Sequence, residues 1–262
     1  MPTPNPHLFL SPHLDDAALS CGGQIAGLTQ AKAAVQVVTI FAGDAPADGL
    51  SPFAAALHQD WGLGPNPPAL RRAEDSQALA LLGADFTHLP HGDAIYRRGA
   101  QGLFYADREA IFGPPASEEA AAFPAQLAAE LAALLGGPGQ ATLHAPLAVG
   151  RHVDHTLARA AALILMQAGH AVQFYEDYPY SAVEGQVEQA LAELPPLRPA
   201  PAPYDEEFLA LRLRAVGCYG SQLGVLFGGP AAMALQTLEH AAGLAQQMRL
   251  AASFAERVWL PA

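Results

Sequence analysis

The sequence has almost no lysine and no run of basic residues, and its formal net charge is −12. A strongly acidic chain without a basic patch is a poor ligand for nucleic acid or for an anionic membrane surface, so we expect neither as the main partner. Cysteine is scarce as well, because Cys21 and Cys218 are the two in the chain. Two cysteines do not make a disulfide framework in a chain of this length, which favours a reducing compartment.

Long apolar runs are also missing. The longest stretches, such as residues 160–166, are far too short to cross a bilayer. The N-terminus has neither the basic region nor the apolar stretch of a signal peptide. We therefore expect a cytoplasmic protein without membrane insertion. What the chain does have is apolar content, 51% of its residues, which is enough for a sizeable core.

Strand-like and helical segments alternate along the first two thirds of the chain. The expected strands are residues 7–10, 35–41, 85–89, 141–147 and 172–175. The expected helices are residues 15–28, 69–82, 118–135 and 156–168. Continuous β-branched runs such as 35–41 are typical of parallel strands buried on both faces. This order predicts an α/β fold with a Rossmann-like, doubly wound, mostly parallel sheet and helices on both faces.

We expect one domain over residues 1–262, with a core of about 7–175 and the C-terminal elements 176–262 packed on it. Residues 43–69 form a connection so long that a functional role is favoured, and we interpret them as a partly helical loop over the site. Residues 92–112 are expected to be irregular. Residues 195–203, with five prolines, are expected to be an extended connector, followed by helices over 205–219 and 230–259.

Two polar clusters each follow an expected strand. The first reads SPHLDD over residues 11–16, and the second reads HVDH over residues 152–155. Ligands of doubly wound sheets bind beyond the carboxyl ends of the strands, so both clusters are expected at that edge. Together they contain the side chains that metal-assisted hydrolysis requires. The other histidines lack the spacing of metal ligands; among them, His91 and His144 are of interest because both fall near the ends of expected strands.

A catalytic zinc ion takes three protein ligands and leaves one position for water. His13 and Asp16 lie three residues apart at a strand-to-helix turn, and His155 enters a later helix; these three would be the ligands. A metal there would lower the pKa of a bound water toward about 7. Asp15, beside the ligands, can take the proton of that water as general base.

The remaining residues of the second cluster have candidate roles too. His152 lies one helical turn before His155 and, if cationic, can stabilise a developing oxyanion or protonate the leaving amine. Asp154 can hydrogen-bond a histidine and fix its tautomer. Each residue also has a structural interpretation, since Asp15 and Asp16 could simply cap a helix. The joint occurrence of both clusters after strands favours a metal site.

These segments resemble the family of N-acetylglucosaminyl deacetylases called PIG-L or LmbE-like. Its hallmarks are a (Pro/Ala)-His-Pro-Asp-Asp-Glu segment after the first strand and a late His-Pro-Asp-His segment. Here PHLDDA stands at residues 12–17, and HVDH at residues 152–155. Between them, RRAE at residues 71–74 resembles an Arg-x-x-Glu helix of the family, and CGG at residues 21–23 is similar to another family segment. The resemblance covers roughly residues 7–175.

The resemblance implies a zinc-dependent hydrolase that removes an N-acetyl group from an N-acetylglucosamine-type sugar conjugate. It implies one Zn²⁺ per chain, or another divalent metal, held by the three ligands already named, with the same general base and oxyanion partner. It adds Arg71 and Asp93 as substrate contacts, and Asp44 after the second strand as a weaker candidate. The structural alternatives are an exposed helical arginine for Arg71 and a turn-forming aspartate for Asp93.

The sequence departs from the family pattern at several positions. Leu14 and Val153 replace prolines, and Ala17 replaces a glutamate. No aromatic residue directly precedes the second cluster, so substrate contacts are expected from Tyr178, Tyr180 or the 43–69 loop. Two alternative functions stay open: a metal-dependent hydrolase of another small amide or ester, and a non-catalytic sugar-binding α/β module. The expected partner is a small-molecule sugar conjugate, and a homo-oligomer stays open.

Overall fold

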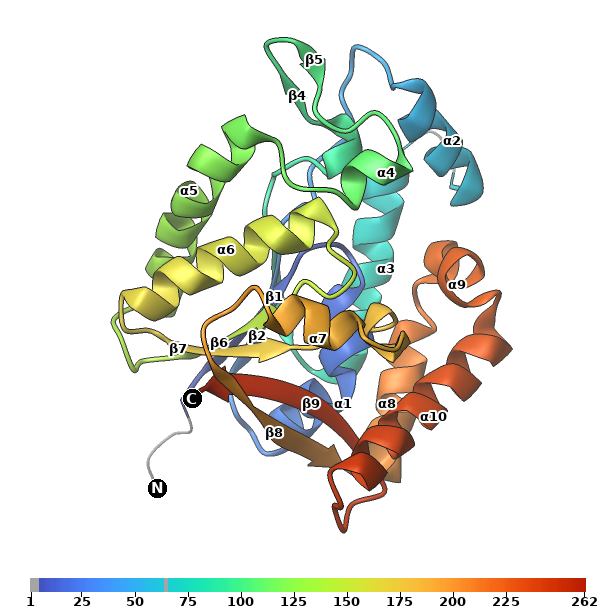
Figure 1. Ribbon diagram of the computed structural model, residues 1–262. Coiled ribbons are helices and arrows are strands. Elements are labelled where there is room, and N and C mark those ends of the chain that lie inside the picture. Colours follow the sequence, from blue (N-terminus) through green and yellow to red (C-terminus); the bar gives the residue numbers. More distant parts are fainter. Residues whose placement is uncertain (1–4, 64–65) are drawn as a thin grey trace.

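The computed structural model describes residues 5–63 and 66–262, and within them seven strands form one sheet in the order β3-β2-β1-β6-β7-β9-β8 (Figure 1). The strands of this sheet are β1 (His7–Ser11), β2 (Val35–Thr39), β3 (Asp85–His88), β6 (Thr142–Pro146), β7 (Ala171–Tyr175), β8 (Leu197–Tyr204) and β9 (Phe254–Pro261). A separate short hairpin pairs β4 (Arg98–Gly99) with β5 (Gly102–Leu103). Among the described residues, no helix has the length and apolarity that crossing a membrane requires.

Five neighbouring strands of this sheet are parallel, namely β3, β2, β1, β6 and β7. From β1 the chain builds outward through β2 to β3, and then it returns to the other side of β1 with β6 and β7. The strand order therefore reverses between β1 and β6, which is the switch point where doubly wound sheets bind ligands. The prediction of a doubly wound, mostly parallel α/β fold is confirmed.

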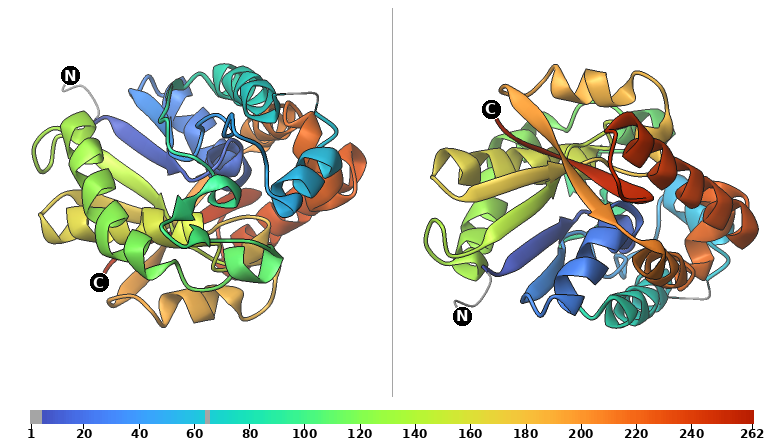
Figure 2. Two further views of the ribbon diagram at one scale, coloured as in Figure 1. Left: turned by 90° about the horizontal axis from the view of Figure 1, so that it is seen from above. Right: turned by 90° about the horizontal axis from the view of Figure 1, so that it is seen from below.

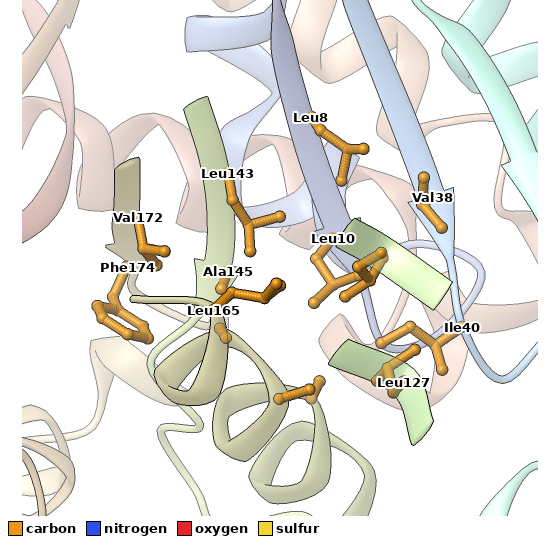
Figure 3. Packing of buried hydrophobic residues seen from close by; sticks show 14 of the residues in the cluster. Leu8, Leu10, Val38, Ile40, Leu127, Leu143, Ala145, Leu165, Val172 and Phe174 are labelled. Atoms are coloured by element: carbon orange, nitrogen blue, oxygen red, sulfur yellow. The ribbon is translucent and has the colours of Figure 1, made fainter. Parts of the chain in front are cut away.

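Helices cover both faces of the sheet (Figure 2). One face carries α5 (Ser117–Leu135), α6 (Val153–Gln167) and α7 (Gln186–Leu191). The other face carries α1 (Asp16–Gln30), α3 (Pro67–Leu82), α8 (Glu206–Val216), α9 (Gly220–Phe227) and α10 (Pro230–Gln247). Figure 3 shows how Leu8, Leu10 and Val38 of the sheet meet Leu127 of α5 and Leu165 of α6. Burial of each such leucine stabilises the fold by roughly 1.5–3 kcal/mol.

The prediction of a connector over residues 195–203 is wrong, because these residues form the edge strand β8. Pro199, Pro201 and Pro203 face Trp259, Arg257 and Ala255 of β9 at alternate positions. Since alternate residues direct their backbone groups to the same side of a strand, the three missing N–H groups all fall on the open edge. The residues between them hydrogen-bond to β9, and the prolines prevent another strand from pairing with the sheet.

The prediction of a helix over residues 230–259 is wrong in its last part. Helix α10 ends at Gln247, and β9 inserts between β7 and β8 as an antiparallel strand. Residues 248–259 contain no glycine or proline that would end a helix. Its strand conformation depends on two neighbouring strands that are distant in sequence, and long-range pairing overrides local helix propensity.

Residues 51–61 and 94–112, which we call the cap, lie beyond the carboxyl ends of the parallel strands. The cap contains α2 (Pro52–Asp60), the 3₁₀ turn η1 (Ala94–Tyr96) and α4 (Arg108–Ile111). The expectation of a partly helical 43–69 segment is therefore confirmed, although residues 64–65 lie outside the described residues. The cap has its own small core, in which Ala54, Ile95, Tyr105 and Val153 of α6 pack together. This contact places the cap over the start of α6.

Candidate active site

Both polar clusters lie at the carboxyl edge of the sheet, as their positions after two strands predicted, and the strand order places them at the switch point between β1 and β6. His13, Asp15 and Asp16 occupy the turn from β1 into α1. His152 is the N-cap residue of α6, and Asp154 and His155 follow in its first turn. The loop before α6 holds two non-glycine residues in the left-handed region, Ala148 (φ 60°) and Arg151 (φ 63°). Such backbone strain concentrates at functional sites, where the surrounding structure maintains it.

Three candidate ligand atoms form a nearly equilateral triangle. The Nε2 atom of His155 lies 3.3 Å from Nδ1 of His13 and 3.3 Å from Oδ2 of Asp16. The third edge, from Nδ1 of His13 to Oδ2 of Asp16, is 3.4 Å. Tetrahedral zinc with bonds of 2.0–2.2 Å requires ligand atoms about 3.3–3.6 Å apart. The side chains therefore fit a tetrahedral metal ion with one position left open.

Carboxylates hold the far ring nitrogen of both histidines. The Nε2 atom of His13 lies 2.8 Å from Oδ2 of Asp154, and Nδ1 of His155 lies 2.6 Å from Oδ1 of Asp177. Each carboxylate accepts a hydrogen bond, so we assign the proton to the nitrogen that faces it. With a metal bound, the other nitrogen of each ring would present its lone pair to the triangle, an arrangement typical of metal-binding histidines.

Asp177 was not predicted as a site residue. It lies two residues after the end of β7, at the same edge of the sheet as the two clusters, and its side chain is buried. Its Oδ2 atom accepts a hydrogen bond of 2.8 Å from the backbone N–H of Val149. Its position after a predicted parallel strand was the signal in the sequence that could have identified it.

Charge is concentrated around the triangle. Burial alone would lower the pKa values of His13 and His155, but hydrogen bonds and nearby carboxylates outweigh it. The pKa of His13 is raised well above its usual range, and that of His155 to about 10. Burial alone would raise the pKa of Asp16, yet the two histidines hold it well below its usual range. A buried set of carboxylates with this preference for positive charge suits a divalent cation.

His152 is held as a neutral imidazole. Its Nδ1 atom accepts a hydrogen bond of 3.2 Å from the backbone N–H of Asp154. Burial and the neighbouring His13 lower its pKa well below the usual range. With Nδ1 as acceptor, the proton of the neutral ring lies on Nε2, which is then a neutral donor. One nitrogen of each of His13, His152 and His155 lies within 4.8 Å of the others, so the His152 ring borders the triangle.

Asp15 is buried beside Arg71. The Arg71 guanidinium lies 3.5 Å from Oδ2 of Asp15, donates a hydrogen bond of 3.4 Å to the carbonyl of Leu14, and lies 4.9 Å from the ring centre of Trp61. Burial raises the pKa of Asp15, Arg71 lowers it and Asp16 raises it further, to about 7 in total. A carboxyl group with this pKa can exchange a proton near neutral pH. Arg71 is thus a buried neighbour of Asp15 rather than an exposed helical residue.

The two other predicted substrate contacts differ in location. Asp93 lies at the site, with Oδ2 4.0 Å from Nε2 of His13, while its Oδ1 accepts a hydrogen bond of 3.2 Å from the N–H of Ile95. Asp44 lies outside the cluster: its side chain is 71% exposed and pairs with Arg72 at 2.7 Å. The structure therefore brings Asp93, and not Asp44, to the candidate site.

Two aromatic rings border the imidazoles. Phe112 of the cap lies 5.3 Å from His152, and Tyr180 lies 6.0 Å from Phe112 and 6.5 Å from His155, measured between ring centres. A Cβ atom on Gly150 would approach the Tyr180 ring to 2.9 Å, so the glycine permits this packing. Of the tyrosines expected to replace the missing aromatic residue, Tyr180 lies at the site. Tyr178 instead stacks on His240, with ring centres 4.8 Å apart.

Comparisons with known proteins agree with this arrangement. The sequence model of the PIG-L family, described as GlcNAc-PI de-N-acetylase, matches residues 8–166. A 2'-N-acetylparomamine deacetylase from Streptomyces fradiae is 30% identical over 97% of this chain and 89% of the relative. One from Niallia circulans is 31% identical over 66% of both.

Solved structures show the same similarity. The zinc-inhibited form of teicoplanin deacetylase Orf2 has a TM-score of 0.84 and 29% identity, with 96% of both chains covered. The A40926 pseudoaglycone deacetylase Dbv21 has a TM-score of 0.77 and 32% identity, with 98% of this chain and 96% of that chain covered.

Proposed function

Because the chain belongs to the PIG-L family, we propose that it is a zinc-dependent deacetylase that hydrolyses the acetamide of an amino sugar within a larger conjugate. The triangle of His13, Asp16 and His155 carries this proposal, because its edges of 3.3–3.4 Å fit tetrahedral zinc coordination. The expectation of a deacetylase is confirmed by the family membership and by the named relatives. The metal and the substrate are the finer points of the proposal.

The residues around the triangle divide the chemistry among them. Bound zinc supplies Lewis acidity and makes water acidic enough to act as a nucleophile near neutral pH. Asp15, whose pKa is raised to about 7, takes the proton of the attacking water. The neutral Nε2–H of His152 donates a hydrogen bond to the carbonyl oxygen of the acetamide as negative charge develops on it. As the C–N bond breaks, the departing nitrogen takes up the proton that Asp15 had accepted, and acetate and a free amino sugar result.

Three further residues keep the reacting groups oriented. Asp154 and Asp177 hold the rings of His13 and His155 so that their lone pairs face the metal position. Arg71 lies against the Asp15 carboxylate and fixes its orientation. Asp93, at the edge of the cluster, is the candidate contact for a sugar hydroxyl.

We propose an N-acetylated amino-sugar unit of a glycosylated natural product as the substrate. The named relatives support this class, because they deacetylate N-acetylparomamine or are teicoplanin and A40926 pseudoaglycone deacetylases. The net charge of −12 also favours substrates with positive charge, such as an aminoglycoside. The cytoplasmic location and the oligomeric state stay predictions.

The test pairs metal analysis with acetate release. Purified protein, as isolated and after zinc reconstitution, is incubated with 2'-N-acetylparomamine and with N-acetylglucosamine. A peptide with an N-acetylated glycine serves as the non-sugar amide. We expect about one zinc per chain and acetate release from the sugar conjugate. Asp15→Asn should retain zinc and lose acetate release, while Asp44→Asn, outside the cluster, should match the parent.

The other outcomes separate the alternatives. Zinc binding with release only from the non-sugar amide would identify a hydrolase of another small amide. Sugar binding without acetate release in the zinc-loaded parent would identify a non-catalytic binding module. Failure to bind any divalent metal after reconstitution would refute the proposed mechanism.

A further inference from the structure

Arg97 is a largely buried cation in the cap that no motif in the sequence identifies. It follows η1, and its side chain is 13% exposed. Its guanidinium reaches two carboxylates: Nη1 lies 2.6 Å from Oδ1 of Asp154, and Nε lies 2.5 Å from Oε1 of Glu119. A third contact of 3.1 Å goes to the carbonyl of Gly92. Nη2 also lies 3.3 Å from Oε2 of Glu119. All of these partners are acceptors, so the guanidinium is fixed in one orientation.

Both oxygens of Asp154 are engaged, and its side chain is fully buried. Oδ2 accepts hydrogen bonds from Nε2 of His13 at 2.8 Å and from the N–H of Ala94 at 3.1 Å. Oδ1 faces Arg97. Because an uncompensated charge in a buried site is costly, the Arg97 guanidinium is what allows a carboxylate to stand behind His13.

Two aromatic rings and a residue of helix α5 also pack around the Arg97 guanidinium. Its guanidinium lies 4.7 Å from the ring centre of Phe41 and 5.4 Å from that of Tyr105. Glu119 of α5 also accepts a hydrogen bond of 2.6 Å from the Tyr105 hydroxyl. Arg97 therefore connects the cap and α5 to the candidate metal ligand His13 through Asp154.

We propose that Arg97 is a positioning residue for the metal site. By holding Oδ1 it fixes the charge and the plane of the Asp154 carboxylate, so that Oδ2 accepts from Nε2 of His13 and the lone pair on Nδ1 faces the metal. This inference rests on the proposed function, since it requires that His13 binds the metal. Through Arg97, the cap would contribute to metal affinity in addition to covering the site.

The test measures metal affinity rather than activity alone. Zinc affinity is determined by competition with a chromogenic chelator for the parent, Arg97→Gln and Arg97→Lys. Loss of a residue that orients a metal ligand typically weakens binding 10–100-fold, and we expect this for Arg97→Gln. Arg97→Lys keeps the positive charge but cannot reach two carboxylates in a fixed fork, so its affinity should lie between the two.

Arg159 offers a matched control. It is also a buried arginine in an ion pair, with Nη2 2.7 Å from Glu193 and Nη1 3.2 Å from the carbonyl of Leu147. It lies on α6, the helix that carries His155, but touches no partner of a candidate ligand. Arg159→Gln should therefore lower stability without weakening zinc binding. Thermal unfolding of each metal-free variant shows which proteins are folded.

A double-mutant cycle with Asp154→Asn tests the route of the effect. If Arg97 acts through Asp154, Arg97→Gln should cost little further affinity in the Asp154→Asn background. Equal losses in both backgrounds, unchanged affinity in Arg97→Gln, or equal weakening by Arg159→Gln would each overturn the inference. If Arg97→Gln does not fold, the Lys variant decides: affinity equal to the parent's overturns the inference. If the parent binds zinc and releases acetate but the variants give one of these contrary results, this inference alone is refuted. A parent that binds no metal refutes the proposed function.

Discussion

Replacement of His144 should reduce the loss of unfolding free energy that the protein undergoes at acidic pH. His144 lies in β6 and is 1% exposed. Its ring stacks on Phe9 of β1, with centres 4.0 Å apart and planes inclined by 10°. Its Nε2 lies 2.9 Å from Nδ1 of His7. Despite its chemistry as a possible ligand, this histidine belongs to the core between the two central strands.

The size of the effect follows from linkage. Burial, and then the neighbouring His7, lower the pKa of His144 to about 3, against 6.5 for the ordinary group. Below pH 6.5 the unfolded chain binds a proton that the folded chain does not. The contribution of neutral His144 is therefore complete above pH 6.5 and is lost as the pH falls toward 3. At pH 5, which is 1.5 units lower, the loss is about 2 kcal/mol of unfolding free energy.

The assay is urea unfolding of the parent and of His144→Leu at pH 7.5 and pH 5, with a chelator present throughout. Leucine keeps an apolar side chain against Phe9 and does not titrate. We expect the parent to lose about 2 kcal/mol more than the variant between the two pH values. If both proteins lose the same free energy, His144 is not a neutral core residue and the reasoning fails.

Three further predictions follow from particular contacts. Asp177→Asn should weaken zinc binding about 10–100-fold in chelator competition, because the charged acceptor behind His155 is lost; parental affinity would contradict that role. Asp44→Asn should leave kcat/KM for acetate release within about twofold of the parent, since surface substitutions have small effects, and a larger drop would place Asp44 in the site. Gly23→Ala should lower the unfolding free energy by about 1–3 kcal/mol, because its Cβ would lie 2.5 Å from the Tyr204 ring; an unchanged urea midpoint would disprove that tight packing.

The parallel part of the fold and the composition of the candidate site could be predicted from local sequence. Continuous apolar runs such as residues 35–41 mark buried parallel strands without reference to their neighbours. A polar cluster directly after such a strand lies at the carboxyl edge of the sheet. Two clusters after β1 and β6 therefore had to share the edge where the strand order reverses.

The antiparallel part could not be predicted in this way. The prolines of β8 exclude a central strand but are compatible with either an edge strand or a connector. Only the pairing of β8 with β9 decides between them. Arg97 was missed for a similar reason, since it lies in no motif and its partner Asp154 is remote in sequence. Asp177 did follow a predicted strand, but only the fold brings it to His155.

The sequence by itself determined which donors are present and in what local order, because the chemistry of imidazole and carboxylate belongs to the residue type. Tertiary structure alone decided their distances and charge states. It brings Nδ1 of His13 to 3.3 Å from Nε2 of His155 across 142 positions of the chain. It also makes His152 neutral and His144 part of the core. The physical reason is that a pKa and a tautomer depend on burial and on neighbouring charges, which only the folded chain brings together.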